Sequence, residues 1–139
     1  PQNPIRRHGK MAVKFQSEQY FEAVNAALQN DEAVKKAARG QNVLVQVVTQ
    51  NVPGDGEKRT YLKITDGFPE TGIGEVDKPD ATITQNYDTA CALDQGSLNA
   101  QTAFMQGKIK IKGSLMKMMH LQGFLQALAP AVASIEREY

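Results

Sequence analysis

The 139-residue chain has one cysteine, no tryptophan and almost no excess of either charge. It carries 16 Lys and Arg against 15 Asp and Glu, so its formal net charge is +1. Nucleic-acid binding relies mainly on Lys and Arg neutralising phosphates, so this balance argues against a nucleic-acid partner and against a strongly cationic membrane surface. A single cysteine forms neither an internal disulfide nor a cysteine-rich metal site, which leads us to expect a reducing, cytoplasmic setting.

Long apolar runs are also missing. No apolar run approaches the roughly 20 residues that span a bilayer, and the N-terminal segment lacks the apolar region of a secretory signal. Residues 1–10 are rich in basic residues and precede Met11, a plausible natural start. We interpret residues 1–10 as a leader added for expression, or alternatively as a disordered natural arm, and residues 11–139 as a single domain.

Short motifs for catalysis or metal binding are absent too. The chain contains no G-x-S-x-G, H-E-x-x-H or C-x-x-C. Gly72-Ile73-Gly74 lacks the third glycine and the following helix of a nucleotide-binding loop, so it predicts a turn. The loop at residues 54–56 lacks the repeated carboxylates of a calcium site. We therefore expect no metal and no cofactor, and these motifs give no specific indication of an enzyme.

Two side chains could still take part in catalysis. His120 is the only histidine after residue 10, and it stands beside an apolar helical stripe, which favours a surface or boundary position. Cys91 lies in an alanine-rich segment and reads as a small buried apolar residue. An enzyme centred on His120 would need an acidic or nucleophilic partner within hydrogen-bond reach. Acid–base chemistry by a pair of carboxylates stays open at this stage.

The first half of the chain predicts two helices and a hairpin. Ser17 is a good N-cap, and the apolar residues after it recur at helical spacing. A second helix begins near Asp31 and stops at Gly40. The β-branched run 43–48 predicts a covered strand, and the alternating run 61–65 pairs with it through a Gly- and Pro-rich turn.

The second half predicts short strands between helices. We expect a weak strand near 73–76, a strand from residue 81, a helix capped by Asn86, a short helix at 100–106 and an alternating strand at 108–112. One long last helix should start at Ser114, with a kink or restart at Pro130. The order of elements indicates an α+β fold, a mostly antiparallel sheet covered by helices. The apolar stripe of that last helix is Met118, Leu121, Leu125, Leu128 and Val132.

Four of the five methionines fall within residues 105–119, among Phe and Leu residues. Methionine suits adaptable contact surfaces, yet apolar stripes at helical spacing are usually ordinary core. The alternating lysines at 108, 110 and 112 are equally ambiguous. They indicate either a solvated or protected sheet edge, or an anionic headgroup site beside an apolar cavity.

The block Asn99–Ser114 is more specific than any of the short motifs above. It reads N-A-Q-T-A-F-M-Q-G-K-I-K-I-K-G-S and closely resembles the signature of the sterol carrier protein 2 family. The Met- and Leu-rich segment up to His120-Leu121-Gln122 continues the resemblance, which covers about residues 17–128. The chain has Ala100 where the family often has proline, and Met116 and Lys117 where it often has glycine and an aliphatic residue.

The resemblance implies a five-stranded sheet with helices over one face and an apolar tunnel between them. Such a tunnel receives a sterol, fatty acid, fatty acyl-CoA or other isoprenoid without chemical change, so we expect a lipid carrier with the last helix or the segment after Pro130 as a mobile cover. The alternative is an interaction or dimerisation module with a small or filled pocket. We expect a monomer or homodimer with transient membrane contact. The residues that the resemblance places at the ligand are Phe104, Met105, Gln106, Ile109, Ile111, Leu115, Met119 and Phe124, with Phe21 from the first helix.

Overall fold

The computed structural model describes residues 6–7 and 10–139, with side chains from residue 12 onward. Two short strands, β1 (Arg6–Arg7) and β2 (Lys10–Met11), pair antiparallel at the start. Residues 1–5 and 8–9 lie outside the described residues, so the interpretation of residues 1–10 as a leader or an arm stays a prediction.

A five-stranded sheet forms the centre of the fold, as the resemblance implies. Its strands follow the order β6-β5-β4-β7-β8, and each neighbouring pair is antiparallel except β4 and β7, which run parallel. The expected α+β fold with a mostly antiparallel sheet is therefore confirmed. The strands are β4 (Val43–Val52), β5 (Gly56–Thr65), β6 (Phe68–Ile73), β7 (Ala81–Asn86) and β8 (Ile109–Gly113).

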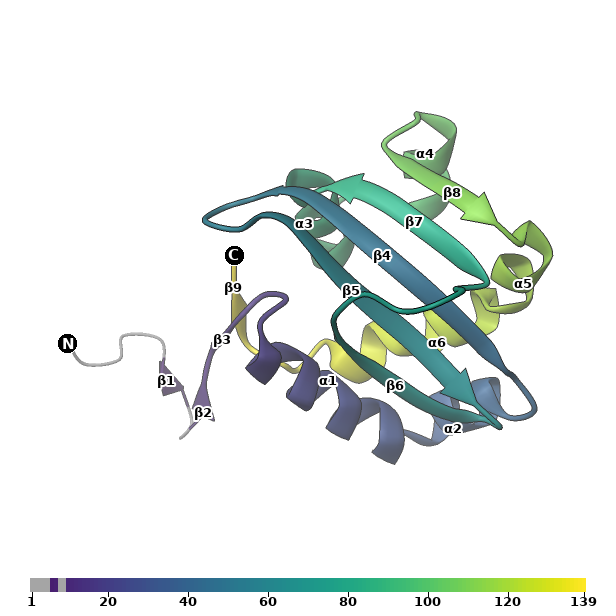
Figure 1. The fold of residues 1–139 in the computed structure, drawn as a ribbon. Helices are drawn as coiled ribbons and strands as arrows, with labels where there is room; N and C mark the ends of the chain where they lie inside the picture. The colour runs from purple at the N-terminus through teal and green to yellow at the C-terminus, as the bar shows by residue number, and fades with distance from the viewer. Residues whose placement is uncertain (1–5, 8–9) are drawn as a thin grey trace.

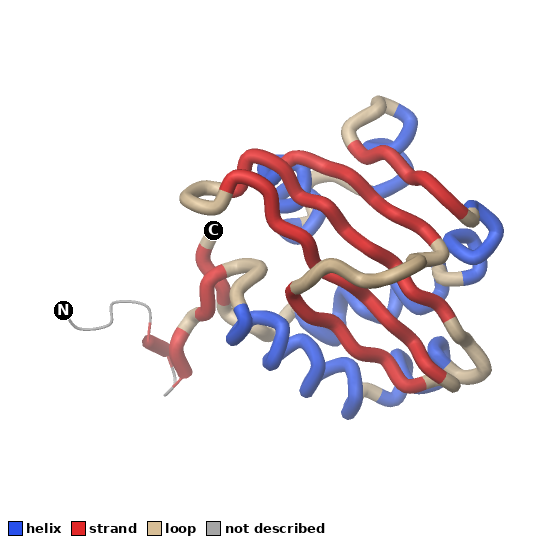
Figure 2. The backbone as a smooth tube through the Cα atoms, viewed as in Figure 1, coloured by secondary structure: helices blue, strands red, loops and turns tan. Residues whose placement is uncertain are grey.

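The helices gather on one side of the sheet (Figure 1). The connection from β6 to β7 crosses the opposite side as a long loop (Figure 2). Strand β3 (Val13–Lys14) pairs parallel with β9 (Arg137–Glu138), which brings the last residues beside the start of the first helix. The helices are α1 (Glu18–Asn30), α2 (Glu32–Ala38), α3 (Tyr87–Gln95), α4 (Ala100–Met105), α5 (Leu115–His120) and α6 (Gln122–Val132).

Most helix starts follow the N-cap signals in the sequence. The Ser17 hydroxyl accepts a hydrogen bond from the Tyr20 amide at 3.1 Å, which begins α1. Asp31 caps α2, Asn99 caps α4 and Ser114 caps α5 in the same way. Asn86 precedes α3 but makes no capping bond, because its side-chain oxygen accepts instead from Asn51 at 2.8 Å.

The strand expected at 73–76 was placed wrongly, since β6 runs from Phe68 to Ile73. A proline removes one ladder donor, so Pro69 fits only an edge strand, and β6 is an edge strand. The free side of this strand bonds to α1. The Asn25 side chain accepts from the Thr71 amide at 2.7 Å and donates to the Thr71 carbonyl at 2.9 Å. These long-range bonds explain why a Pro- and Gly-containing segment is extended here.

The prediction of a single long last helix is also wrong, because the segment divides at Leu121 into α5 and α6. The Leu121 amide donates to the carbonyls of both Lys117 and Met118, which tightens the final turn of α5. Gly123 weakens helix propensity just beyond the break. Pro130 lies inside α6 and does not end it.

Candidate functional site

A cavity of about 650 Å³ lies between the helix-side face of the sheet and the helices α1, α3 and α6. This volume falls within the roughly 300–1,000 Å³ of small-molecule pockets. Its sheet wall follows from register. Val45 pairs with Leu62 across β4 and β5, and Val47 pairs with Ile83 across β4 and β7, so these four side chains share one face.

The helix wall consists of the apolar stripes seen in the sequence. Phe21 and Val24 line the cavity from α1, one turn apart on the same helix face. The stripe of the last two helices continues this wall on the other side, with every one of its members at the cavity. Those members are Met118, Leu121, Leu125, Leu128 and Val132.

Asp94 and Arg137 close one part of the wall as a buried ion pair. The Arg137 Nη1 atom lies 2.8 Å and 3.1 Å from the two Asp94 carboxylate oxygens, and the two side chains are only 9% and 13% exposed. Tyr139 donates its hydroxyl to the same carboxylate, and the Arg137 guanidinium lies 5.5 Å from the Tyr20 ring centre. Among the described lining residues these are the only two charged side chains, and each neutralises the other.

Burial keeps the hydroxyl and thiol groups near this cluster protonated. Desolvation raises the pKa of Tyr87 to about 12 and also raises the pKa values of Tyr20 and Tyr139. The tyrosines are therefore neutral donors at physiological pH. Burial likewise raises the pKa of the partly buried Cys91 thiol, which leaves it a poor nucleophile.

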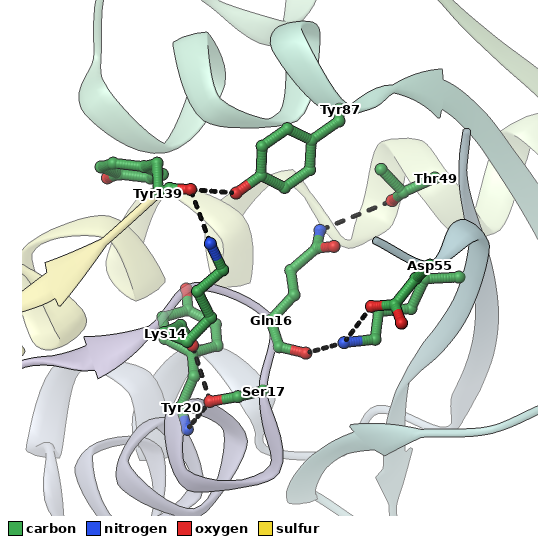
Figure 3. A network of polar contacts seen from close by, with 9 residues as sticks. Lys14, Gln16, Ser17, Tyr20, Thr49, Asp55, Tyr87 and Tyr139 are labelled. Atoms are coloured by element: carbon green, nitrogen blue, oxygen red, sulfur yellow. Dashed lines mark hydrogen bonds and ion pairs between the residues drawn. The ribbon is translucent and has the colours of Figure 1, made fainter. Parts of the chain in front are cut away.

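A second polar cluster lies where Gln16 enters the cavity wall between β3 and α1 (Figure 3). The Gln16 side-chain amide donates to the Thr49 hydroxyl at 3.5 Å, and Gln85 donates to the same hydroxyl at 3.4 Å. The Gln16 backbone carbonyl accepts from Lys58 at 2.8 Å. The Gln16 Oε1 atom is buried without a hydrogen-bond partner.

Comparison with known proteins identifies the family. The sequence pattern of the SCP-2 sterol transfer family matches residues 21–126. The chain belongs to this family. It is 37% identical over 70 residues to sterol carrier protein 2 of Gallus gallus, a match that spans 50% of this chain and 13% of that protein. It is also 36% identical over 104 residues to a fatty acid-binding protein of Yarrowia lipolytica, across 72% of this chain and 75% of that protein.

Solved structures agree on the fold. A protein from Thermus thermophilus described as a possible sterol carrier protein superposes with a TM-score of 0.73 at 19% identity, covering 93% of this chain and 94% of that one. Membership of the SCP-2 sterol transfer family supports lipid binding and transfer as the function, and the family is generally one of non-catalytic lipid carriers.

The described side chains add little that points to chemistry. His120 is exposed, and its side chain makes no hydrogen bond or ion pair within the described part of the chain. No group of three His, Cys, Asp or Glu among the described residues is placed to hold a metal ion. No helix within residues 6–7 and 10–139 combines the length and apolar character needed to cross a bilayer.

The ligand residues that the resemblance implies are scattered relative to the cavity. Phe21 lines it, whereas Phe124 and Ile109 are buried away from it and Ile111 packs half-buried against the core. The remaining five side chains are exposed outside it, and their role at a ligand stays a prediction. These five are Phe104, Met105, Gln106, Leu115 and Met119.

Several of these exposed residues form a distinct edge of the molecule along β8, with α4 at one end and α5 at the other (Figure 1). We call this the basic edge. Its lysines stand in a stretch, residues 95–135, that contains four Lys and no Asp or Glu. One of them, Lys117, pairs with Asp80 at 3.2 Å. The basic edge comprises Phe104, Met105, Leu115, Met116 and Met119, which are 46–78% exposed, and Lys108, Lys110, Lys112 and Lys117.

Sequence reasoning missed the polar part of the cavity wall. The spacing of the stripe in α5 and α6 predicts an apolar helix face, but periodicity does not distinguish a packed neighbour from an empty volume. Gln16, Asp94 and Arg137 carry no motif. Arg137 comes from the far end of the chain, where β9 pairs with β3.

Proposed function

We propose that the chain binds one lipid in the cavity and carries it without chemical change. The observation that carries this proposal is an apolar cavity of about 650 Å³ in a member of a lipid-transfer family. Each methylene moved from water into such a cavity contributes about 0.8 kcal/mol. A chain or ring system that fills the space between α6 and the sheet would therefore bind without any strong polar contact.

The charges of the wall favour a neutral lipid over an anionic one. Arg137 is the only cationic side chain among the described lining residues, and its guanidinium is already paired with the Asp94 carboxylate. A carboxylate moved into this space would lose its hydration without gaining an unpaired cation. A sterol, long-chain alcohol or isoprenoid suits the cavity best, and a fatty acid or acyl-CoA would keep its charged end at the surface.

The C-terminal segment forms part of the cavity wall, and we assign it control of ligand access. Val132, Ala133, Arg137 and Tyr139 all line the cavity. The segment is attached through the Arg137–Asp94 pair, the hydrogen bonds of Tyr139 with Asp94 and Tyr87, and the short β3–β9 ladder. Separating these contacts would widen the access to the cavity while the sheet stays intact. We assign it the role of a mobile cover, and propose that such opening extends the cavity into a tunnel.

The basic edge supplies a site for lipid exchange. Exposed Phe, Leu and Met side chains beside lysines are the pattern by which proteins dock at anionic phospholipid surfaces. We propose that the basic edge makes transient contact with a membrane of this charge. The protein would then act as a monomer that collects lipid on the cytoplasmic face of a membrane.

The second candidate is an interaction or dimerisation module, which the same exposed side chains favour. Met105 is 78% exposed and Met119 is 69% exposed, more than a folded chain normally leaves uncovered without a use. In that case a second copy of the chain or another protein would cover the basic edge. Sedimentation at rising protein concentration distinguishes the two candidates, because a carrier that docks on membranes stays monomeric.

Native mass spectrometry of the purified protein, followed by organic extraction, tests the carrier function directly. We expect a retained lipid at about one per chain, or a mass shift of that stoichiometry after adding 1-hexadecanol or cholesterol. A ligand-free mass that does not shift with a sterol, fatty acid, acyl-CoA or alcohol would contradict lipid carriage and favour the interaction module.

A further inference from the structure

Gln16 combines two costly features at one point of the cavity wall. Its backbone has φ = 66°, in the left-handed region that residues other than glycine seldom adopt. Its side chain is 6% exposed, and its Oε1 atom has no partner. Buried polar atoms in folded proteins are almost always hydrogen-bonded, so an unpaired acceptor in a cavity wall requires an explanation.

The neighbours of Gln16 leave this amide poorly satisfied. Its bond to the Thr49 hydroxyl measures 3.5 Å and the bond from Gln85 to that hydroxyl measures 3.4 Å, both longer than a normal N–H···O bond of about 2.7–3.2 Å. Thr49 itself is fully buried, and Gln16 and Gln85 both line the cavity. Three polar side chains therefore converge on a wall that is otherwise mainly apolar.

Exchanging the amide nitrogen and oxygen of Gln16 does not remove the unpaired atom. In that orientation the oxygen accepts from Thr49, and the nitrogen takes the position without a partner. A hydroxyl group is both a donor and an acceptor, so it satisfies Gln16 in either orientation. The last torsion of a glutamine side chain is soft, which lets the amide turn toward a bound group.

We propose that Gln16, Thr49 and Gln85 form the headgroup subsite of the cavity, and that it selects a neutral lipid bearing a hydroxyl group. The ligand hydroxyl donates to Gln16 Oε1 and accepts from the Gln85 amide, while its hydrocarbon extends along the apolar wall. An ester cannot donate to Gln16. A carboxylate lacks the donor and meets no free cation in this network. The Lys58 ammonium is bonded to the Gln16 carbonyl and lies 3.7 Å from Asp55, and the Lys14 ammonium is bonded to the Tyr139 carbonyl. The subsite rests on the proposed lipid-binding function and refines it.

The test compares two neutral lipids of equal chain length, 1-hexadecanol and methyl palmitate, in the whole chain and in Gln16→Met. Methionine keeps the length of the side chain without its polar atoms. The matched control is Gln126→Met, which changes an exposed glutamine on α6 that does not line the cavity. Affinities are measured by native mass spectrometry, and ligand-free stability is measured by thermal unfolding.

We expect the unaltered chain to bind the alcohol about fivefold more tightly than the ester, because one net hydrogen bond contributes about that factor in affinity. Gln16→Met should lower the alcohol affinity about fivefold, leave the ester affinity unchanged and keep or raise the unfolding temperature, because it removes an unpaired buried acceptor. Gln126→Met should keep the preference. If Gln16→Met does not fold, Gln85→Met should show a partial loss of the preference.

Four results would overturn the subsite, and they separate it from the function on which it rests. If both lipids bind equally to the unaltered chain, or if Gln16→Met keeps the preference for the alcohol, carriage stands and the subsite is wrong. If Gln16→Met loses both lipids and stability together, the glutamine has a purely structural role. If neither lipid binds the unaltered chain, lipid carriage fails as well.

Discussion

The wall of the cavity and the basic edge have similar compositions but opposite surroundings. Both contain Met, Leu and Phe side chains. In the wall, Met118 and Leu121 are buried and face the space between helix and sheet, whereas Met116 and Met119, on the same short helix, are 68% and 69% exposed. One face of α5 thus serves the interior and the other serves the surface. Apolar side chains of similar composition are divided between two tasks by helix geometry.

The difference is also electrostatic. The two charges of the cavity wall cancel, while the segment 95–135 that contains the basic edge has lysines and no acidic residue. A neutral interior excludes ionic headgroups, and a positive surface attracts anionic lipid. A carrier that collects a neutral lipid from a charged membrane requires this separation.

Filling the cavity should have the largest effect on lipid affinity, because it changes the wall and leaves the basic edge intact. Leu128 is half-buried on α6 and lines the cavity, so Leu128→Trp should place an indole in the space that a lipid would occupy. We expect at least about tenfold weaker binding of 1-hexadecanol, with the unfolding temperature unchanged or raised because the void is filled. Native mass spectrometry and thermal unfolding measure the two quantities.

Met119→Trp is the matched control, since Met119 is exposed outside the cavity. Its affinity in solution should stay within about twofold of the unaltered chain. A large loss with Met119→Trp and none with Leu128→Trp would instead support the ligand residues that the family resemblance implies, and would make the α6 cavity a packing void.

The sequence predicts the fold well where signals are local. Ser17, Asp31 and Asn99 start helices because a side-chain oxygen and an amide three residues later suffice, and no distant partner is needed. The strand β6 could not be placed, because its free edge is satisfied by Asn25 from α1, 46 residues earlier in the chain. The cavity could not be predicted from the sequence for the same reason. Its stripe is local, but the absence of a packed neighbour is a property of the assembled layers.

Neutralising one lysine of the basic edge should have a smaller effect than filling the cavity, and this effect should be limited to membrane binding. Each lysine near an anionic surface contributes about 1 kcal/mol, so Lys110→Gln should weaken binding to phosphatidylserine-containing vesicles about fivefold. Lys36→Gln, on α2 away from the edge, should change it little. Vesicle co-sedimentation at two salt concentrations measures both, and binding of 1-hexadecanol in solution should be unaffected. Equal losses from both variants would show that net charge, and not the basic edge, drives the contact.

The smallest effect concerns the closure of the cavity at high pH. Tyr87 donates its hydroxyl to the Tyr139 carbonyl at 3.1 Å and so ties α3 to the C-terminal segment. Its pKa is raised from 10.0 to about 12 in the fold, so the stabilisation is complete below pH 10 and is lost as the pH rises from 10 to 12. Tyr87→Phe should lower the free energy of unfolding at pH 7 by about 1 kcal/mol and make the decline between pH 10 and 12 shallower. Urea unfolding across that range measures both quantities. Met116 on the basic edge has no hydroxyl bond to lose, so Met116→Ser should leave the alkaline profile unchanged. A profile altered equally by both variants would remove Tyr87 as its cause.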